Sequence, residues 1–267
     1  MPAKRKAAIV CCSNGISLSR KDFVEALCDT LYKQDCTPVL SDFLYAKDGV
    51  FSGNGMQRAR ALMDFYKNPD IDAILDISGG DIANEILPYL DFDVIARSKK
   101  TFVGYSDLTV ILNAIYAKTG LASILYPVKN LLTARGDDIF FPQNLHWIQG
   151  SHMQGVVLGG NIRCLLKLAG TEYFPDMTDA VLLLEARSGT PAQMTTYFSQ
   201  LKMLGVFEKI NGILLGTFTE MEQLSCTPTV PELLKNYVSN ALPIAQTRWI
   251  GHGKDARGIW IGRELAL

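Results

Sequence analysis

The stretch KTFVGYSDLTVILNAIYAKTG, residues 100–120, passes from one kind of secondary structure to another within a few residues. The apolar run Thr101–Val103 predicts a short buried strand, and Gly104 follows it directly. From Leu108 onward, apolar residues recur at the three- and four-residue spacing of a helix face. A strand that leads straight into a helix is the unit from which α/β folds are built, so this stretch points to that class.

The same unit recurs about every thirty residues through the first half of the chain. Apolar runs predict strands at 7–12, 37–41, 72–78 and 101–106. Helical spacing predicts intervening helices at 20–33 and 54–67, one through Ile82, Ile86 and Leu90, and one from Leu108. Uniformly apolar strands are typical of a parallel sheet that is covered on both faces. We therefore expect an N-terminal doubly wound α/β domain with a mostly parallel sheet.

The rhythm breaks between about residues 127 and 155, and we place a domain boundary there. We expect a nucleophile-bearing α/β domain over residues 1–140 and a second, mixed α/β domain over residues 141–267. In the second half, strands are predicted at 155–160, 180–186, 212–216 and near the end of the chain. Helices are predicted at 162–168, 191–204 and 230–240.

Composition excludes several classes of function. A net charge of −1 gives no basic excess for binding nucleic acid. No apolar run approaches the ~20 residues of a membrane span, and the short N-terminal apolar run does not have the pattern of a signal peptide. The six cysteines form no CxxC pair and have no zinc-like spacing, so they predict reduced thiols and no metal site. We expect a cytoplasmic protein with neither membrane nor nucleic-acid partners.

In open α/β sheets, ligands bind beyond the carboxyl ends of the strands, so the residues at those ends are the site candidates. Ser106 stands at such an end. It could cap the following helix, as could Asp107, or the corner could expose its hydroxyl for chemistry. Gly79-Gly80 follows another strand and forms either a plain turn or a backbone surface for an oxyanion. Neither segment has the G-x-G-x-x-G spacing of a dinucleotide site.

Two further strand ends carry Glu185 and His252. Glu185 ends an apolar run, where a buried carboxylate needs a polar partner. His252 lies between two glycines. A serine, a glutamate and a histidine at three strand ends form a coherent nucleophile, orienting group and base.

These residues also carry a resemblance. The segment GGDIANEILPYLDFDVIARSKKTFVGYSDLTVILNAIYAKTG, followed in order by GVVLGGNIRCLLKLAGT, LLLEA, QLKMLGVFEKINGILLGTF and GHG, resembles the LD-carboxypeptidase family of serine peptidases. That family includes muramoyl-tetrapeptide carboxypeptidases and microcin C immunity peptidases. The resemblance covers nearly the whole chain and implies a partly barrel-like second domain, with the site between the two domains.

The resemblance implies a catalytic triad of Ser106, Glu185 and His252 and an oxyanion hole formed by the N–H groups of Gly80 and Asp107. It implies no cofactor, and it implies a homodimer. As substrate-binding residues we predict Gly79, Asp81, Gly160 and Asn161. Arg163 is a weaker candidate for the cation that holds the carboxylate of the leaving residue.

The sequence leaves several substrate classes possible. The leading expectation is a serine carboxypeptidase that cleaves an amide near the C-terminus of a small or murein-type peptide. An immunity-type peptidase that cleaves aminoacyl-nucleotide amides is a second possibility, although the segment between Ser106 and Glu185 is short for that branch. A non-catalytic binder of small molecules or peptides on the same fold is a third. A nucleotide-dependent α/β enzyme has the least support, because the chain lacks a phosphate-binding loop.

Overall fold

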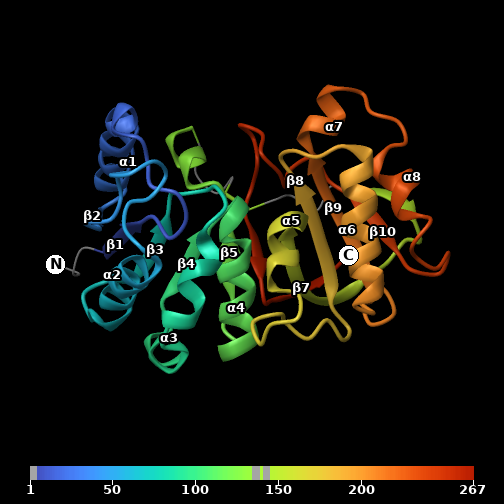
Figure 1. Cartoon of the computed structure of the whole chain (residues 1–267), viewed down its shortest axis with the longest axis horizontal. Coiled ribbons are helices and arrows are strands. Elements are labelled where there is room, and N and C mark those ends of the chain that lie inside the picture. The colour runs from blue at the N-terminus through green and yellow to red at the C-terminus, as the bar shows by residue number, and fades with distance from the viewer. Residues whose placement is uncertain (1–4, 134–138, 141–144) are drawn as a thin grey trace.

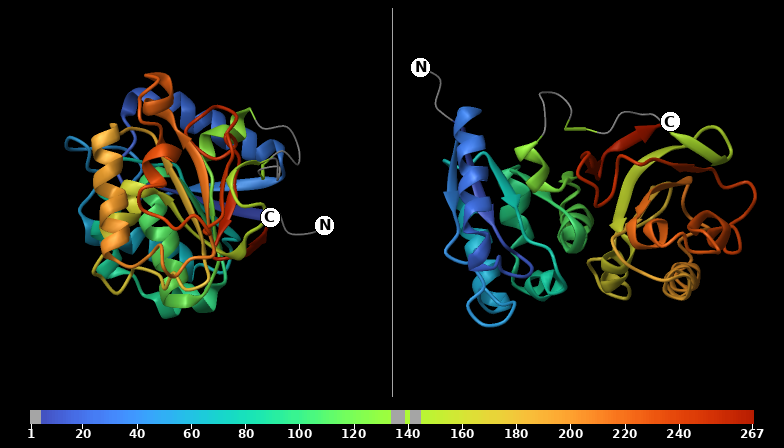
Figure 2. Two further views of the ribbon diagram at one scale, coloured as in Figure 1. Left: turned by 90° about the vertical axis from the view of Figure 1, so that its right-hand side faces the viewer. Right: turned by 90° about the horizontal axis from the view of Figure 1, so that it is seen from above.

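The computed structural model describes residues 5–133, 139–140 and 145–267. It contains two six-stranded sheets that lie side by side, with helix α4 (Thr109–Thr119) between them (Figure 1). The second sheet curls into a half-barrel, as the view from above shows (Figure 2). The predicted fold, a doubly wound α/β half followed by a mixed, partly barrel-like half, is confirmed.

The first sheet has the strand order β11-β5-β4-β3-β1-β2. All of its pairings are parallel except the antiparallel contact of β11 with β5. Its strands are β1 (Arg5–Val10), β2 (Cys36–Leu40), β3 (Ala73–Asp76), β4 (Thr101–Gly104), β5 (Ser123–Leu125) and β11 (Ile259–Ile261). Its helical elements are η1 (Leu18–Arg20), α1 (Lys21–Lys33), α2 (Gly55–Lys67), η2 (Ala83–Tyr89), α3 (Phe92–Ser98), η3 (Ser106–Leu108), α4 and η4 (Val128–Leu132).

The second sheet has the order β12-β7-β8-β9-β10-β6, with the four central strands parallel and both outer pairings antiparallel. Its strands are β6 (His146–Gln149), β7 (Gln154–Asn161), β8 (Val181–Ala186), β9 (Gly212–Phe218), β10 (Ile244–Gln246) and β12 (Glu264–Ala266). Its helices are α5 (Ile162–Leu165), η5 (Leu166–Leu168), α6 (Pro191–Met203), α7 (Thr219–Gln223) and α8 (Val230–Leu234).

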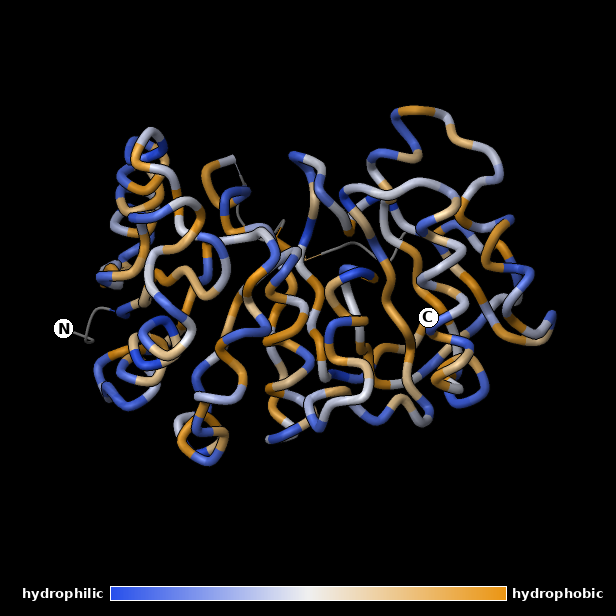
Figure 3. The backbone as a smooth tube through the Cα atoms, in the orientation of Figure 1, coloured by the Kyte–Doolittle hydropathy of each residue, from blue (hydrophilic) through white to orange (hydrophobic). Residues whose placement is uncertain are grey.

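Both faces of the first sheet are buried, which explains its uniformly apolar strands. Along β1, Ala7 and Ile9 belong to a core cluster with helix α1, whereas Ala8 and Val10 belong to the larger cluster shared with the second sheet. This alternation is the two-residue period of a strand. Helix α4 has little polar face, because its residues from Thr109 to Ile115 are all buried between the sheets. The hydropathy colouring shows most of β8 as apolar (Figure 3), because Val181 to Leu184 form an unbroken apolar run before Glu185.

Three sequence expectations need correction. The segment after Gly80 forms the 3-10 helix η2, which contains Pro88, in place of an α-helix. The helix predicted at 230–240 ends at Leu234. The strand at Ile259–Ile261 joins the first sheet, so the segment 141–267 contributes to both sheets. The predicted domain boundary at 140/141 adjoins residues 141–144, which lie outside the described part, and it stays a prediction.

In the described ranges, no helix combines the length and apolar character that a membrane crossing requires.

Candidate active site

Ser106 occupies a sharp corner between β4 and α4. Its backbone is in the left-handed region, with φ 56°, which is strained for a residue other than glycine. Gly104 permits the tight turn, because a Cβ there would lie 2.7 Å from Cβ of Leu108. Neither η3 nor α4 has a side-chain cap, so the interpretation of Ser106 or Asp107 as a helix cap is wrong. The corner instead projects the Ser106 hydroxyl toward a histidine.

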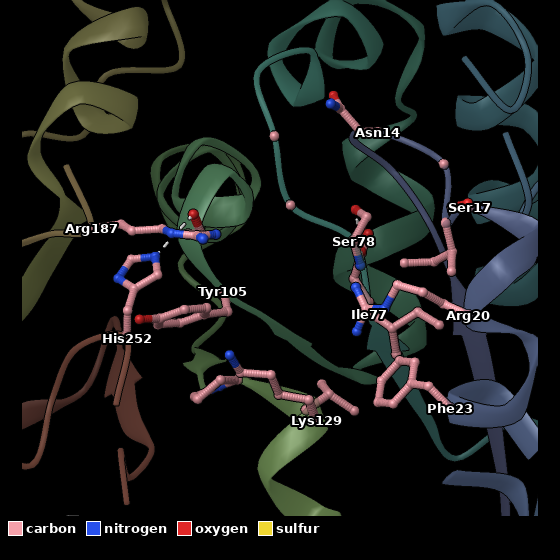
Figure 4. A pocket seen from close by; sticks show the side chains of 18 residues that line it. Asn14, Ser17, Arg20, Phe23, Ile77, Ser78, Tyr105, Lys129, Arg187 and His252 are labelled. Atoms are coloured by element: carbon pink, nitrogen blue, oxygen red, sulfur yellow. Dashed lines mark hydrogen bonds between the residues drawn. The ribbon is translucent and has the colours of Figure 1, made fainter. Parts of the chain in front are cut away.

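His252 brings Ser106 and Glu185 together. Its Nε2 lies 3.3 Å from Oγ of Ser106, the contact that the dashed line at His252 marks in Figure 4. Its Nδ1 lies 2.8 Å from Oε2 of Glu185. The second contact is angled away from regular hydrogen-bond geometry but is within ion-pair distance. The imidazole also packs against the ring of Tyr105, with the two ring centres 4.6 Å apart. The three residues that the sequence singles out at separate strand ends therefore meet at one point.

Glu185 is fully buried, so its charge depends on its neighbours. Besides His252, the side-chain amide of Asn161 donates a hydrogen bond to Oε1 of Glu185 at 3.1 Å. The N–H of Asn161 donates to Oγ1 of Thr109, and Gly160 approaches the same threonine so closely that a Cβ would lie 2.8 Å from that oxygen. Asn161 and Gly160, predicted to bind substrate, thus lie behind the glutamate and outside the cavity lining.

Asp107 is also fully buried, and its carboxylate fixes the surroundings of the nucleophile. It accepts hydrogen bonds from Oγ of Ser13 at 2.6 Å and from the N–H of Ala83 at 2.8 Å, and it pairs with Nζ of Lys167. These bonds tie the ends of β1 and β4 to the start of η2. The N–H of Asp107 lies in the first turn of η3, where no preceding turn supplies a carbonyl, so it is available to a ligand.

The glycine loop after β3 lines the same space with Gly79 and Gly80. Gly80 has φ 124°, and a Cβ there would lie 2.2 Å from Cγ of Asn14, so only glycine fits. Asp81 points to the outside and pairs with Arg163, and this hydrogen bond lowers the pKa of Asp81. Neither Asp81 nor Arg163 lines the cavity, although both were predicted to contact substrate. Arg163 holds the loop, since it also donates to the carbonyl of Gly80.

A cavity of about 400 Å³ opens in front of Ser106 and His252. Three cationic side chains line it, and sequence reasoning missed all three: Arg20, Lys129 and Arg187. Arg187 had a usable signal, because it follows the strand end at Glu185 by two residues. Arg20 and Lys129 had none, because a charge at the end of a helix or in a loop is ordinarily solvated.

The only carboxylate in the described lining is Asp76, which is 1% exposed. Burial raises the pKa of Asp76, and its oxygens accept hydrogen bonds from the N–H groups of Cys12 and Ser78 and from the hydroxyl of Ser78. The Asp76 carboxylate is thus engaged by hydrogen bonds from the protein itself. The side chains that remain available to a ligand in the cavity are mainly cationic.

A strained serine at a strand–helix corner, a histidine in contact with its hydroxyl and a buried carboxylate on the far ring nitrogen form the arrangement that serine hydrolases use. The comparisons with known proteins support a peptidase. Residues 7–126 match the LD-carboxypeptidase N-terminal domain, and residues 154–267 match the LD-carboxypeptidase C-terminal domain. The chain belongs to the LD-carboxypeptidase family.

Curated relatives include both branches of that family. The chain is 28% identical to the microcin C7 self-immunity protein MccF of Escherichia coli over 62% of this chain and 61% of that protein. It is 25% identical to a probable murein peptide carboxypeptidase of Bacillus subtilis over 85% of this chain and 78% of that protein. The alignments with the first three relatives span 61%, 62% and 64% of those proteins' lengths.

Among solved structures, the wild-type apo state of MccF superimposes with a TM-score of 0.89 at 22% identity, over 100% of this chain and 93% of that one. This likeness concerns the fold.

Proposed function

We propose that this chain is a serine carboxypeptidase that hydrolyses an amide bond near the C-terminus of a small or murein-type peptide. The observation that carries the proposal is the chain of contacts from Oγ of Ser106 through the ring of His252 to Glu185, with separations of 3.3 and 2.8 Å. The named murein peptide carboxypeptidase among the relatives supports the choice of bond and substrate class.

In the proposed reaction, Nε2 of His252 takes the hydroxyl proton as Oγ of Ser106 attacks the carbonyl carbon. Glu185 orients the ring and stabilises the imidazolium that forms. The N–H groups of Asp107 and Gly80 donate to the oxyanion, each contributing about 2.7–4 kcal/mol in comparable sites. The imidazolium then protonates the leaving amine, and the C–N bond breaks to give an acyl-enzyme. Water, deprotonated by His252, attacks the ester and releases Ser106.

The cavity supports an exopeptidase over an endopeptidase. A carboxypeptidase must hold the carboxylate of the leaving residue, and Arg187 lies beside His252 in the cavity wall (Figure 4). A guanidinium binds a carboxylate with two parallel hydrogen bonds, which also fixes the orientation of the residue. We therefore assign the terminal carboxylate to Arg187 in place of the loop at Gly160.

The test is the variant Ser106→Ala, assayed by mass spectrometry on a panel of murein peptides and aminoacyl sulfamoyl-adenylates. Loss of a triad nucleophile reduces kcat by about 10⁶-fold in comparable enzymes, so we expect no measurable product. A fluorophosphonate probe should label Ser106 of the wild-type protein. Turnover retained in the variant would remove Ser106 as the nucleophile, and ligand binding without labelling would favour a non-catalytic binder.

A second candidate function is cleavage of aminoacyl-nucleotide amides. The similarity to MccF favours it, and that protein has been solved in complex with aspartyl sulfamoyl adenosine. The same panel separates the two functions by which substrate yields product. The homodimer implied by the resemblance and the cytoplasmic location expected from the apolar runs of the sequence stay predictions.

A further inference from the structure

His252 lies in a loop, residues 247–257, that contains no helix or strand. The N–H of Arg257 donates to the carbonyl of Trp249 at 2.6 Å, which closes the loop on itself but does not attach it to its surroundings. On the N-terminal side of His252, the N–H of Thr217 in β9 donates to the carbonyl of Ile250 at 2.8 Å. The second sheet therefore holds one side of the histidine.

Asn130 holds the other side of His252. Residues 253–255, which follow the histidine directly, are exposed. The side-chain amide of Asn130 donates to the carbonyl of Gly253 at 3.3 Å and to the carbonyl of Ala256 at 3.0 Å. An amide nitrogen carries two hydrogens, so it can supply one to each carbonyl. This one side chain, which is 6% exposed, therefore ties both ends of the turn that follows the histidine.

The element that presents Asn130 is itself well anchored. η4 begins at Val128, which is 2% exposed and belongs to the core cluster shared with helix α1. The N–H of Asn130 donates to the carbonyl of Pro127 at 2.7 Å. Lys129 lines the cavity and reaches toward its His252 side (Figure 4), whereas Asn130 lies outside the described lining. The Asn130 side chain therefore contacts the loop and not the cavity.

We propose that Asn130 is a positioning residue, which keeps the imidazole of His252 between Ser106 and Glu185. This inference rests on the proposed function, because that function makes His252 the general base. Nε2 of His252 lies 3.3 Å from Oγ of Ser106, so a small displacement takes the base out of reach of the hydroxyl proton. A displacement of about 1 Å can lower the rate about 10²-fold. Loss of both hydrogen bonds from Asn130 frees the turn next to the histidine, so we expect a cost of up to that size.

The test variant is Asn130→Leu, which keeps the bulk of the side chain and removes both donors. The matched control is Asn211→Leu, because the side-chain amide of Asn211 also donates to two carbonyls, those of Gln154 at 3.1 Å and Asp179 at 3.2 Å. Asn211 precedes the start of β9, whereas Glu185 lies near the end of the parallel strand β8. Asn130→Ser is a second test variant in case the leucine prevents folding, because the smaller side chain leaves space for water at the two carbonyls.

Three quantities are measured for each variant: the rate at which a fluorophosphonate probe labels Ser106, kcat and KM on a substrate that the wild type cleaves, and amide hydrogen exchange across residues 247–258. We expect both Asn130 variants to lower the labelling rate and kcat about 10- to 100-fold. KM should change little, because the residue acts through the base and not through substrate binding. Hydrogen exchange in the loop should become faster. The control should match the wild type in all three.

Several results would overturn the positioning role. Wild-type labelling and kcat in the Asn130 variants would do so even if the loop exchanged faster, because the residue would then tie the loop without affecting the base. A higher KM at unchanged kcat, or an equal loss in Asn211→Leu, would also overturn it.

The labelling rate separates this inference from the proposed function, because labelling needs no substrate. A wild-type protein that is labelled but cleaves no peptide, with slower labelling in the Asn130 variants, would refute the carboxypeptidase and retain the positioning role. Cleavage by the wild type with equal kcat in those variants would do the reverse. A wild-type protein that is not labelled at Ser106 would refute both.

Discussion

The substitution Gly80→Ala tests the oxyanion hole through the backbone alone. Gly80 has φ 124°, a conformation that costs an alanine about 1–3 kcal/mol. The added Cβ would also lie 2.2 Å from Cγ of Asn14, closer than any real contact. Asn14 has limited freedom to move, because its Oδ1 accepts a hydrogen bond from the N–H of Asp81 at 3.2 Å. The loop must therefore shift, and the N–H of residue 80 shifts with it.

The expected loss follows from what that N–H does in the proposed reaction. Removal of one oxyanion-hole donor costs about 2.7–4 kcal/mol, or 10²- to 10³-fold in kcat. Because the bond strengthens only when the oxyanion forms, kcat and kcat/KM should fall by similar factors while KM changes little. The buried anchor of the site at Asp107 does not involve Gly80, so the protein should still fold.

The assay compares steady-state kcat and KM, together with thermal melting, for Gly80→Ala and Gly79→Ala. Gly79 is the matched control for backbone strain, because a Cβ there meets nothing within 4 Å and its φ needs no glycine. We expect Gly79→Ala to melt like the wild type and to retain far more activity than Gly80→Ala. A wild-type kcat in Gly80→Ala would refute the role of its N–H. Equal losses in both variants would show that crowding of the cavity, and not the donor, is responsible.

Three further predictions concern stability. Ser106→Gly should be about 1 kcal/mol more stable than Ser106→Ala in urea unfolding, because glycine tolerates φ 56° without strain. Lys167→Met should lower the free energy of unfolding by about 3–5 kcal/mol, because it leaves the fully buried Asp107 carboxylate without its cation. Arg163 lowers the pKa of Asp81 below its ordinary value of 3.8, so the stability from this pair is present above that pH and is lost as the pH falls through the lowered value. Asp81→Asn should remove that loss, which is below about 1 kcal/mol for so exposed a pair, in unfolding curves taken across acid pH.

Each of these predictions has a contrary result. Equal stability of the glycine and alanine variants would mean that the corner at residue 106 is not strained. Lys21→Met, which breaks the exposed pair with Glu25, is the control for Lys167→Met and should cost about 0.3–0.5 kcal/mol. Similar costs for the two lysine variants would show that the buried pair contributes nothing special. If the stability of Asp81→Asn still fell at acid pH as it does in the wild type, groups other than Asp81 would be responsible for that fall.

Most of the first sheet could be predicted from the sequence because burial on both faces leaves a local signature. The apolar runs that became β1, β3 and β4 need no distant partner to be recognised. The helix at Ile82–Leu90 was misjudged because Pro88 limits a regular α-helix while the apolar spacing remains. The pairing of β11 with β5 joins residues more than a hundred positions apart, and three apolar residues carry no information about which sheet they will join.

The candidate site also contains residues that the sequence could single out and residues that it could not. Ser106, Glu185 and His252 could be singled out because two of them end apolar strands and the third lies between glycines. The supporting shell could not be foreseen. Asn161 was expected to meet substrate, but its amide is used by the buried carboxylate of Glu185, and Lys167 attracted no notice although it neutralises Asp107. Which polar group satisfies which buried charge is decided by packing between the two sheets.

The segment that carries His252 leaves β10 in the second sheet and ends in β11 of the first. The imidazole therefore lies on a connecting segment whose two ends are held by different sheets. Any movement of one sheet relative to the other would move His252 away from Ser106. The turnover rate therefore reports how well the two halves of the molecule are aligned. Weakening this segment where Trp260 pairs with Ile124 should therefore lower kcat before either half of the molecule unfolds.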